Sequence, residues 1–160
     1  MPKRITRNQA LMRLHKEMEE GACIICHLTH NRKDLILHTG IHATALLSRY
    51  PRTWGQVMVF VHRHVTTLTG LEPAEWKEVT ELVWKASKAL ESTLKPLRCY
   101  VAATGSSVPL PMTSPHFHFN IIPVYDEQDK PSSIFTWEQG LYSGTEEEWE
   151  ELFRTLTTHF

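Results

Sequence analysis

The chain has 160 residues, with 17 lysines and arginines against 18 aspartates and glutamates, so its formal net charge is −1. This length suits one domain with a sizeable core, and the balance of charges excludes a strongly basic surface for unspecific nucleic-acid binding. No apolar run reaches the length of a membrane span, and the first residues lack the apolar segment of a signal peptide. We therefore expect a cytoplasmic protein, without nucleic-acid or membrane partners, whose three cysteines are thiols or metal ligands.

The first predicted elements are a helix, a Cys/His segment and three short strands. Apolar residues recur at helical spacing across residues 5–20, just before Gly21. Residues 23–30 then gather two cysteines and two histidines. The three strands, marked by β-branched and apolar residues, are predicted at residues 35–38, 43–48 and 56–61.

A long helix follows, and it is the strongest periodic signal in the chain. Pro73 sits where the first turn is expected, apolar residues recur at three- and four-residue steps, and Pro96 ends the pattern. Residues 98–103 predict a strand. After a polar turn at residues 126–133, a capping box formed by a threonine and a glutamate predicts a last helix, and its two residues are Thr145 and Glu148.

The most informative segment is residues 116–123, in which polar and large apolar residues alternate. Side chains of a strand point alternately to its two faces, so His116, His118 and Asn120 share one face. The apolar residues between them take the other, which we interpret as a core face. A row of imidazoles on a rigid strand suits covalent or metal chemistry, and a strand with a few polar residues on its solvent face is the open alternative.

Strands on either side of one long helix predict an α+β fold with an antiparallel sheet. We expect a sheet of about five strands, the long helix, and N- and C-terminal helices. No internal repeat or long linker divides the chain, so residues 1–160 are predicted to form a single domain. Its parts are a helical extension at residues 1–20, a core at residues 21–125 and a C-terminal segment with a helix at residues 126–160.

Cys23 and Cys26 form a Cys-x-x-Cys pair with four open interpretations: a redox dithiol, a c-type haem attachment, structural cysteines without a ligand, or half of a zinc site. The first lacks a βαβ pattern and the second an export signal. We favour the zinc site, because two thiolates at this spacing can bind one tetrahedral ion. The candidates for the other two ligands are His27, His30, His62, His64 and His116.

The order of these elements resembles the histidine triad (HIT) superfamily. The early Cys-x-x-Cys, the segment ending at His64, the long helix and a Gly/Ser loop are followed by His-φ-His-φ-x-φ-φ-Pro, where φ is apolar. The resemblance covers residues 23–123. The turn of residues 47–56 is similar to the nucleotide-side turn of the zinc-containing branch that includes diadenosine polyphosphate phosphorylases and galactose-1-phosphate uridylyltransferases.

The resemblance implies a HIT-like fold and a covalent reaction. His118 would attack the α-phosphorus of a nucleotide derivative and become nucleotidyl-histidine, and water, phosphate or a sugar phosphate would then accept the nucleotidyl group. Asn120 and Thr113 would donate to the developing charge. The implied structural zinc ligands are Cys23, Cys26, His64 and His116, and the implied substrate-binding residues are Ser48, Gln56, Gly105 and Ser106.

The chain departs from the family pattern at several positions. The third triad position is Asn120 where most members have histidine, and Ser48 and Gln56 replace the usual aspartate or asparagine and histidine of the turn. Two hypotheses follow: a nucleotide-processing HIT enzyme, or a nucleotide-binding or structural zinc protein that kept the fold and lost the chemistry. The resemblance also implies a homodimer built around the long helix and its neighbouring strand.

Overall fold

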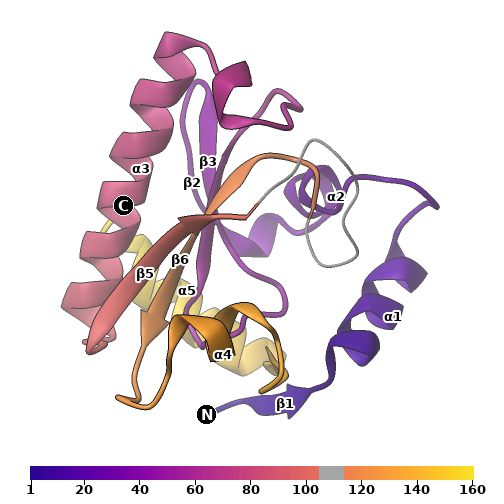
Figure 1. Cartoon of the computed structure of the whole chain (residues 1–160), viewed down its shortest axis with the longest axis vertical. Coiled ribbons are helices and arrows are strands. Elements are labelled where there is room, and N and C mark those ends of the chain that lie inside the picture. The colour runs from indigo at the N-terminus through magenta and orange to yellow at the C-terminus, as the bar shows by residue number, and fades with distance from the viewer. Residues whose placement is uncertain (105–113) are drawn as a thin grey trace.

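The structure is a computed structural model that describes residues 1–104 and 114–160. Its centre is a five-stranded antiparallel sheet in the order β2-β3-β4-β6-β5, shown in Figure 1. The strands are β2 (Ile36–Thr39), β3 (Ala43–Leu47), β4 (Val57–Val61), β5 (Arg98–Ala103) and β6 (His118–Val124). The predicted α+β fold with an antiparallel sheet is confirmed.

Helix α3 (Pro73–Thr93) covers one face of the sheet and supplies much of the core. Pro73 occupies the first turn, where its missing N–H removes no helical hydrogen bond. The buried residues of α3 recur at three- and four-residue steps and pack against β3, β4 and β6; they include Val79, Leu82, Ala86 and Leu90. The long helix predicted from the sequence is therefore confirmed.

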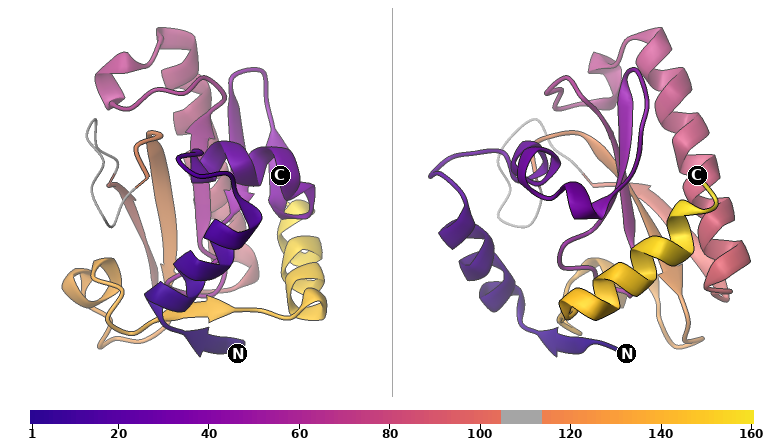
Figure 2. Two further views of the ribbon diagram at one scale, coloured as in Figure 1. Left: turned by 90° about the vertical axis from the view of Figure 1, so that its right-hand side faces the viewer. Right: turned by 180° about the vertical axis from the view of Figure 1, so that it is seen from behind.

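Helices α1 (Arg7–Glu17), α2 (Ile24–Asn31) and α5 (Glu146–Thr157) complete the fold. Helix α5 packs beside β2 and α3, and the right-hand view of Figure 2 shows it in front of them. The predicted capping box begins α5: the Glu148 N–H donates to Thr145 Oγ1 at 3.2 Å, and the Thr145 N–H donates to the Glu148 carboxylate at 2.8 Å. The terminal helices of the predicted fold are thus confirmed.

A second, two-stranded sheet was not predicted. It pairs β1 (Lys3–Ile5) antiparallel with β7 (Leu141–Ser143), from opposite ends of the chain. The helix predicted to start at residue 5 begins two residues later. The reason is Thr6, whose hydroxyl accepts from the Gln9 N–H at 3.2 Å and caps the helix, so that Ile5 is free to pair as a strand.

The polar turn predicted at residues 126–133 is wrong in its last part, because α4 (Pro131–Phe135) begins there. Proline is favoured in the first turn of a helix, and it starts this short one. The remaining short helical turns are η1 (Lys33–Leu35) and η2 (Leu68–Gly70). Among residues 1–104 and 114–160, no helix has the length and apolar character needed to cross a membrane.

Strand β6 lies between β4 and β5 and begins at His118. Phe119 packs against Trp76 of α3, with ring centroids 6.3 Å apart, which confirms that the phenylalanine face is the core face. His118 and Asn120 lie on the opposite face, but only 6% and 1% of their surfaces are exposed. The alternative of a strand with polar residues on a solvent face is therefore wrong.

A test of the small sheet uses two glycines with positive φ. Gly140 has φ 78°, and a Cβ there would lie 2.7 Å from the Ile5 carbonyl oxygen, whereas Gly21, with φ 77°, has no neighbour within 4 Å. Gly140→Ala should lower the free energy of unfolding by about 2–4 kcal/mol, because it adds a clash with backbone to the backbone strain. Gly21→Ala should cost about 1–2 kcal/mol of strain alone. Urea denaturation measures both, and equal losses would show that the β1–β7 contact is not tight.

Candidate metal centre and active site

The N-terminus of α2 holds two sulfurs together. Cys23 is the N-cap of the helix, and its Sγ accepts a hydrogen bond from the Cys26 N–H at 3.5 Å. Residues three apart lie on the same side of a helical turn. Helix capping therefore turns the Cys-x-x-Cys spacing of the sequence into a pair of adjacent thiols.

Four side chains meet at this helix end. One ligand atom each from Cys23, Cys26, His64 and His116 lies within 4.8 Å of all the others. The Nδ1 of His116 is 3.6 Å from each sulfur, and the Nδ1 of His64 is 3.8 Å from the Cys26 sulfur. Bond lengths of about 2.3 Å to sulfur and about 2.0 Å to nitrogen place the S and N ligands of a tetrahedral ion about 3.6 Å apart. The cluster thus has the dimensions of a four-coordinate metal site.

The orientation of His116 also fits a metal ligand. Its Nε2 lies 2.9 Å from the Val61 carbonyl oxygen. Because a carbonyl only accepts, Nε2 carries a proton, and Nδ1 faces the two sulfurs, where it would offer its lone pair to a bound ion. Metal-binding histidines generally donate their second nitrogen in this way, which fixes the tautomer and the ring plane.

The two thiols differ in acidity. Burial acts to raise the pKa of Cys23, but hydrogen bonds from His116 and from the Cys26 N–H outweigh it and lower the pKa to about 6. Burial and the neighbouring Cys23 sulfur raise the pKa of Cys26 to about 11. One negative charge therefore resides on the pair near neutral pH, and a cation between the sulfurs would favour the second.

The other candidate ligands lie elsewhere. The Nε2 of His62 is 2.9 Å from Thr44 Oγ1 of β3 and is not part of the cluster. His27 is half-buried, and its Nδ1 lies 3.1 Å from Asn31 Nδ2, one turn along α2. His30 bonds the Cys26 carbonyl oxygen at 2.7 Å instead of a sulfur. Of the histidines that the sequence left open, the structure brings only His64 and His116 to the two cysteines among the described residues.

His118 lies next to the cluster without being part of it. Its Nδ1–H donates to the His116 carbonyl oxygen at 2.7 Å, which leaves the lone pair on Nε2. Burial lowers the pKa of His118; the hydrogen bond to His116 acts against this, and the charges of His116 and Arg52 reinforce it. The result is a neutral imidazole with a fixed tautomer, which is the form that acts as a nucleophile.

Asn120 has an amide whose orientation is fixed by Gln56. The Arg52 backbone N–H donates to Gln56 Oε1 at 2.9 Å, so the other end of that amide must be its NH₂ group. Gln56 Nε2 donates to Asn120 Oδ1, also at 2.9 Å. Asn120 Nδ2 is consequently the free end, and it is buried without a partner among the described residues. The third triad position therefore offers a hydrogen-bond donor.

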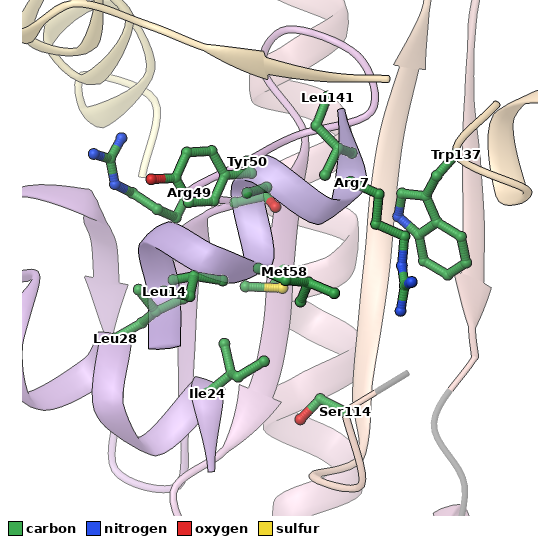
Figure 3. Close-up of a pocket in the computed structure, with 13 residues that line it drawn as sticks. Arg7, Leu14, Ile24, Leu28, Arg49, Tyr50, Met58, Ser114, Trp137 and Leu141 are labelled. Carbon is green, nitrogen blue, oxygen red and sulfur yellow. The ribbon is translucent and has the colours of Figure 1, made fainter. Parts of the chain in front are cut away.

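A pocket of about 180 Å³ adjoins this strand. Figure 3 shows Ile24 and Leu28 of α2 on one side of it, Met58 of β4 at its back and Trp137 on the other side. Met58 is the strand partner of Asn120, which places the pocket beside the His118 strand. Apolar walls with a few polar groups suit a flat organic ring.

The comparisons with known proteins rest on structure, since no protein-family model and no curated protein matches the chain. A Hit-like protein involved in cell-cycle regulation from Bartonella henselae superposes with a TM-score of 0.69 at 17% identity, covering 89% of this chain and 98% of that one. A Zn-bound histidine triad family protein from Mycobacterium smegmatis gives 0.64 at 16% identity, covering 86% and 92%. A uridylyltransferase gives 0.68 at 17% identity; it covers 96% of this chain, which spans 49% of that protein.

The chain has the histidine triad fold. Within this fold, the pocket contains one residue predicted to bind substrate, Ser48, and Gln56 acts on Asn120 instead of lining the pocket. Three further predicted residues lie outside the described part of the chain; they are Gly105, Ser106 and Thr113.

Sequence reasoning missed several residues that line the pocket. Arg7 of α1 and Trp137 line the pocket from segments outside the region of resemblance. Ser114, two residues before His116, lines it too, and its hydroxyl is buried without a partner in the part of the chain described. A hydroxyl residue just before the triad was a usable signal, whereas nothing in the local sequence of Arg7 or Trp137 indicates a pocket.

The hydrogen bond between the Gln56 and Asn120 side chains can be tested by a double-mutant cycle. Gln56→Leu and Asn120→Leu each remove one end of a buried hydrogen bond, and their combined loss should be smaller than the sum by about 1–2 kcal/mol. Urea denaturation of the two single variants and the double variant measures this coupling. Gln56→Leu combined with the distant Thr145→Ala should be additive. A coupling of zero for the first pair would mean that Gln56 does not hold Asn120.

Proposed function

We propose that the protein is a nucleotide-processing enzyme of the histidine triad type, which acts through a covalent nucleotidyl-His118 intermediate. The observation that carries the proposal is the state of His118: a buried imidazole with its proton fixed on Nδ1 and its Nε2 lone pair free. The carbonyl oxygen of His116 accepts the hydrogen bond from that proton, and the His116 ring contacts the two cysteine sulfurs. The nucleophile is therefore held by a residue that is itself fixed in place.

The proposed reaction assigns a role to each residue near His118. The pocket beside Met58 binds the nucleoside, with Ser48 at its polar edge. Nε2 of His118 attacks the α-phosphorus, and Asn120 Nδ2 donates to the charge that develops on the phosphoryl oxygens. Thr113, Gly105 and Ser106 are proposed as further donors. Water, phosphate or a sugar phosphate then accepts the nucleotidyl group, as in the diadenosine polyphosphate phosphorylase and uridylyltransferase branch that the sequence resembles.

We propose that Cys23, Cys26, His64 and His116 hold a structural zinc ion. The donor set supports zinc, since two sulfurs and two imidazole nitrogens at tetrahedral spacing suit it. A bound ion would supply folding free energy and fix the position of His116. The similarity in fold to the Zn-bound histidine triad family protein from Mycobacterium smegmatis supports this assignment.

We also propose a cytoplasmic homodimer. Strand β5 is an edge of the sheet, so its outer hydrogen-bonding groups are free to pair. Large apolar side chains are exposed on β5 and on α3, and they include Trp76, Trp84 and Val101. An exposed apolar surface next to a free strand edge favours association with a second copy.

The covalent step predicts a mass adduct. When the protein is mixed with nucleoside diphosphates, dinucleoside polyphosphates or nucleotide sugars and quenched quickly, intact-mass spectrometry should find one added nucleotidyl group. His118→Ala should abolish the adduct and lower turnover by about 10⁴-fold or more. His62→Ala, which changes a histidine outside the cluster, should keep both. Nucleotide binding without adduct or turnover would instead favour a binding protein that kept the fold and lost the chemistry.

The metal site predicts about one zinc per chain by elemental analysis of the purified protein. Cys26→Ser should lower the zinc content and the melting temperature together, because the ion stabilises only the folded state. Cys99→Ser is the matched control, since Cys99 lies in β5 away from the cluster, and it should leave the zinc content unchanged. A wild-type protein that contains no metal and melts at the same temperature as the zinc-loaded protein would contradict the assignment.

A further inference from the structure

Arg52 is a buried cation without an anion. Only 9% of its surface is exposed, and its Nε is buried with no hydrogen-bond partner among the described residues. Both ion pairs found in the described part of the chain, Arg32–Asp34 and Arg63–Glu75, involve other arginines. A buried charge without a partner is costly, so it is typically retained where a ligand supplies the opposite charge.

Arg52 is held in place by aromatic rings and by its own backbone. Its guanidinium carbon lies 4.3 Å from the centroid of Trp137 and 5.9 Å from that of Phe135. Its backbone N–H donates to Gln56 Oε1, and Gln56 Nε2 donates in turn to Asn120 Oδ1. The stacked guanidinium leaves its edge available for hydrogen bonds to an anion, because stacking uses only the flat face.

The position of Arg52 connects the reacting strand with the pocket. Its backbone N–H is linked through the Gln56 amide to Asn120, which shares a face of β6 with His118. Trp137, on which it stacks, also lines the pocket, where Arg7 lies 5.7 Å from the same ring. The pocket lining includes Arg7 and Arg49 but no aspartate or glutamate. Positive charge thus surrounds the place where the proposed substrate would carry its phosphates.

The backbone conformation of Trp137 also favours a binding site beside Arg52. Its backbone has φ 60°, a left-handed conformation that is rare for residues other than glycine and costs about 1–2 kcal/mol. The indole of this residue lies within 6 Å of two guanidinium carbons, those of Arg7 at 5.7 Å and Arg52 at 4.3 Å. Strained backbone of this kind gathers at binding sites, where the surrounding structure maintains it.

We propose that Arg52 is a specificity-determining residue that binds the phosphate group leaving the α-phosphorus, so that the site selects nucleotides with a second phosphate. This rests on the proposed function. In the step concerned, the lone pair of His118 Nε2 forms the N–P bond and the bond from the α-phosphorus to the bridging oxygen breaks. The bridging oxygen keeps the electron pair and departs on the second phosphate, which takes up a proton from water. Arg52 neutralises the charge that this phosphate gains.

Burial lowers the pKa of Arg52 to about 10, so the group still carries its charge at neutral pH. A uridylyl or adenylyl ester of an uncharged alcohol would leave that charge unpaired. The second phosphate of a nucleoside diphosphate would pair with the charge of Arg52. The discrimination therefore lies in the leaving group and not in the base, which the apolar pocket contacts separately.

The test compares, by isothermal titration calorimetry, the Kd of ligands that carry no phosphate, one phosphate or two phosphates. The probes are adenosine, guanosine and uridine, their 5′-monophosphates, and their α,β-methylene 5′-diphosphates, whose methylene bridge prevents cleavage. In the wild-type protein, the second phosphate should tighten Kd by about ten-fold or more, as expected for hydrogen bonds between charged groups. Arg52→Met, which keeps an aliphatic side chain against Trp137, should reduce this gain to about two-fold or less and leave the Kd of the nucleoside within about two-fold.

Two further variants separate charge from structure. Arg52→Lys keeps the charge but loses the planar donors, so it should keep part of the gain even if Arg52→Met folds poorly. Arg154→Met on the exposed side of α5 is the matched control and should keep all of it. An undiminished gain in Arg52→Met, or no gain in the wild type, overturns the role of Arg52 while nucleoside binding and the His118 adduct leave the proposed function intact. A wild-type protein that binds no nucleoside or nucleotide overturns both.

Discussion

His116 is the residue on which the rest of the site depends. Its Nδ1 faces the two cysteine sulfurs, its Nε2–H donates to the Val61 carbonyl of β4, and its own carbonyl accepts the Nδ1–H of His118. One residue therefore joins the metal cluster, the neighbouring strand and the proposed nucleophile. Because each of these contacts has a fixed direction, the tautomers of both histidines follow from backbone geometry.

The parts of the site that could be predicted from sequence are those set by local periodicity. Alternation along residues 116–123 placed His118 and Asn120 on one face, since the side-chain period of a strand is two. The Cys-x-x-Cys spacing predicted two sulfurs that could bind one ion, and the first turn of α2 brings them together. The choice of His64 over His27 and His30 needed the family resemblance, because a ligand 38 residues away from Cys26 has no local signal.

The parts that could not be predicted depend on long-range packing. Gln56 and Asn120 lie 64 residues apart and meet because β4 and β6 are neighbours, so the donor role of Asn120 is invisible in its own segment. Similarly, β1 and β7 come from opposite ends of the chain, and strands of three residues carry too short a pattern to detect. The family resemblance implies only a substrate contact for Gln56, and the hydrogen bonds of its amide to the Arg52 N–H and to Asn120 have no signal in the sequence.

Several exceptions to good local structure lie beside the proposed nucleophile and the adjoining pocket. Asn120 Nδ2, Arg52 Nε and Ser114 Oγ are buried without partners in the described chain, and Trp137 has a left-handed backbone. Each exception costs free energy that the well-paired sheet and α3 must offset. These three atoms and Trp137 lie beside His118 or the pocket: three hydrogen-bond donors, one of them on a cation, with no acid among the pocket residues. A phosphate group supplies the acceptors and the negative charge that this set lacks, which is why a nucleotide accounts for it better than a neutral ligand does.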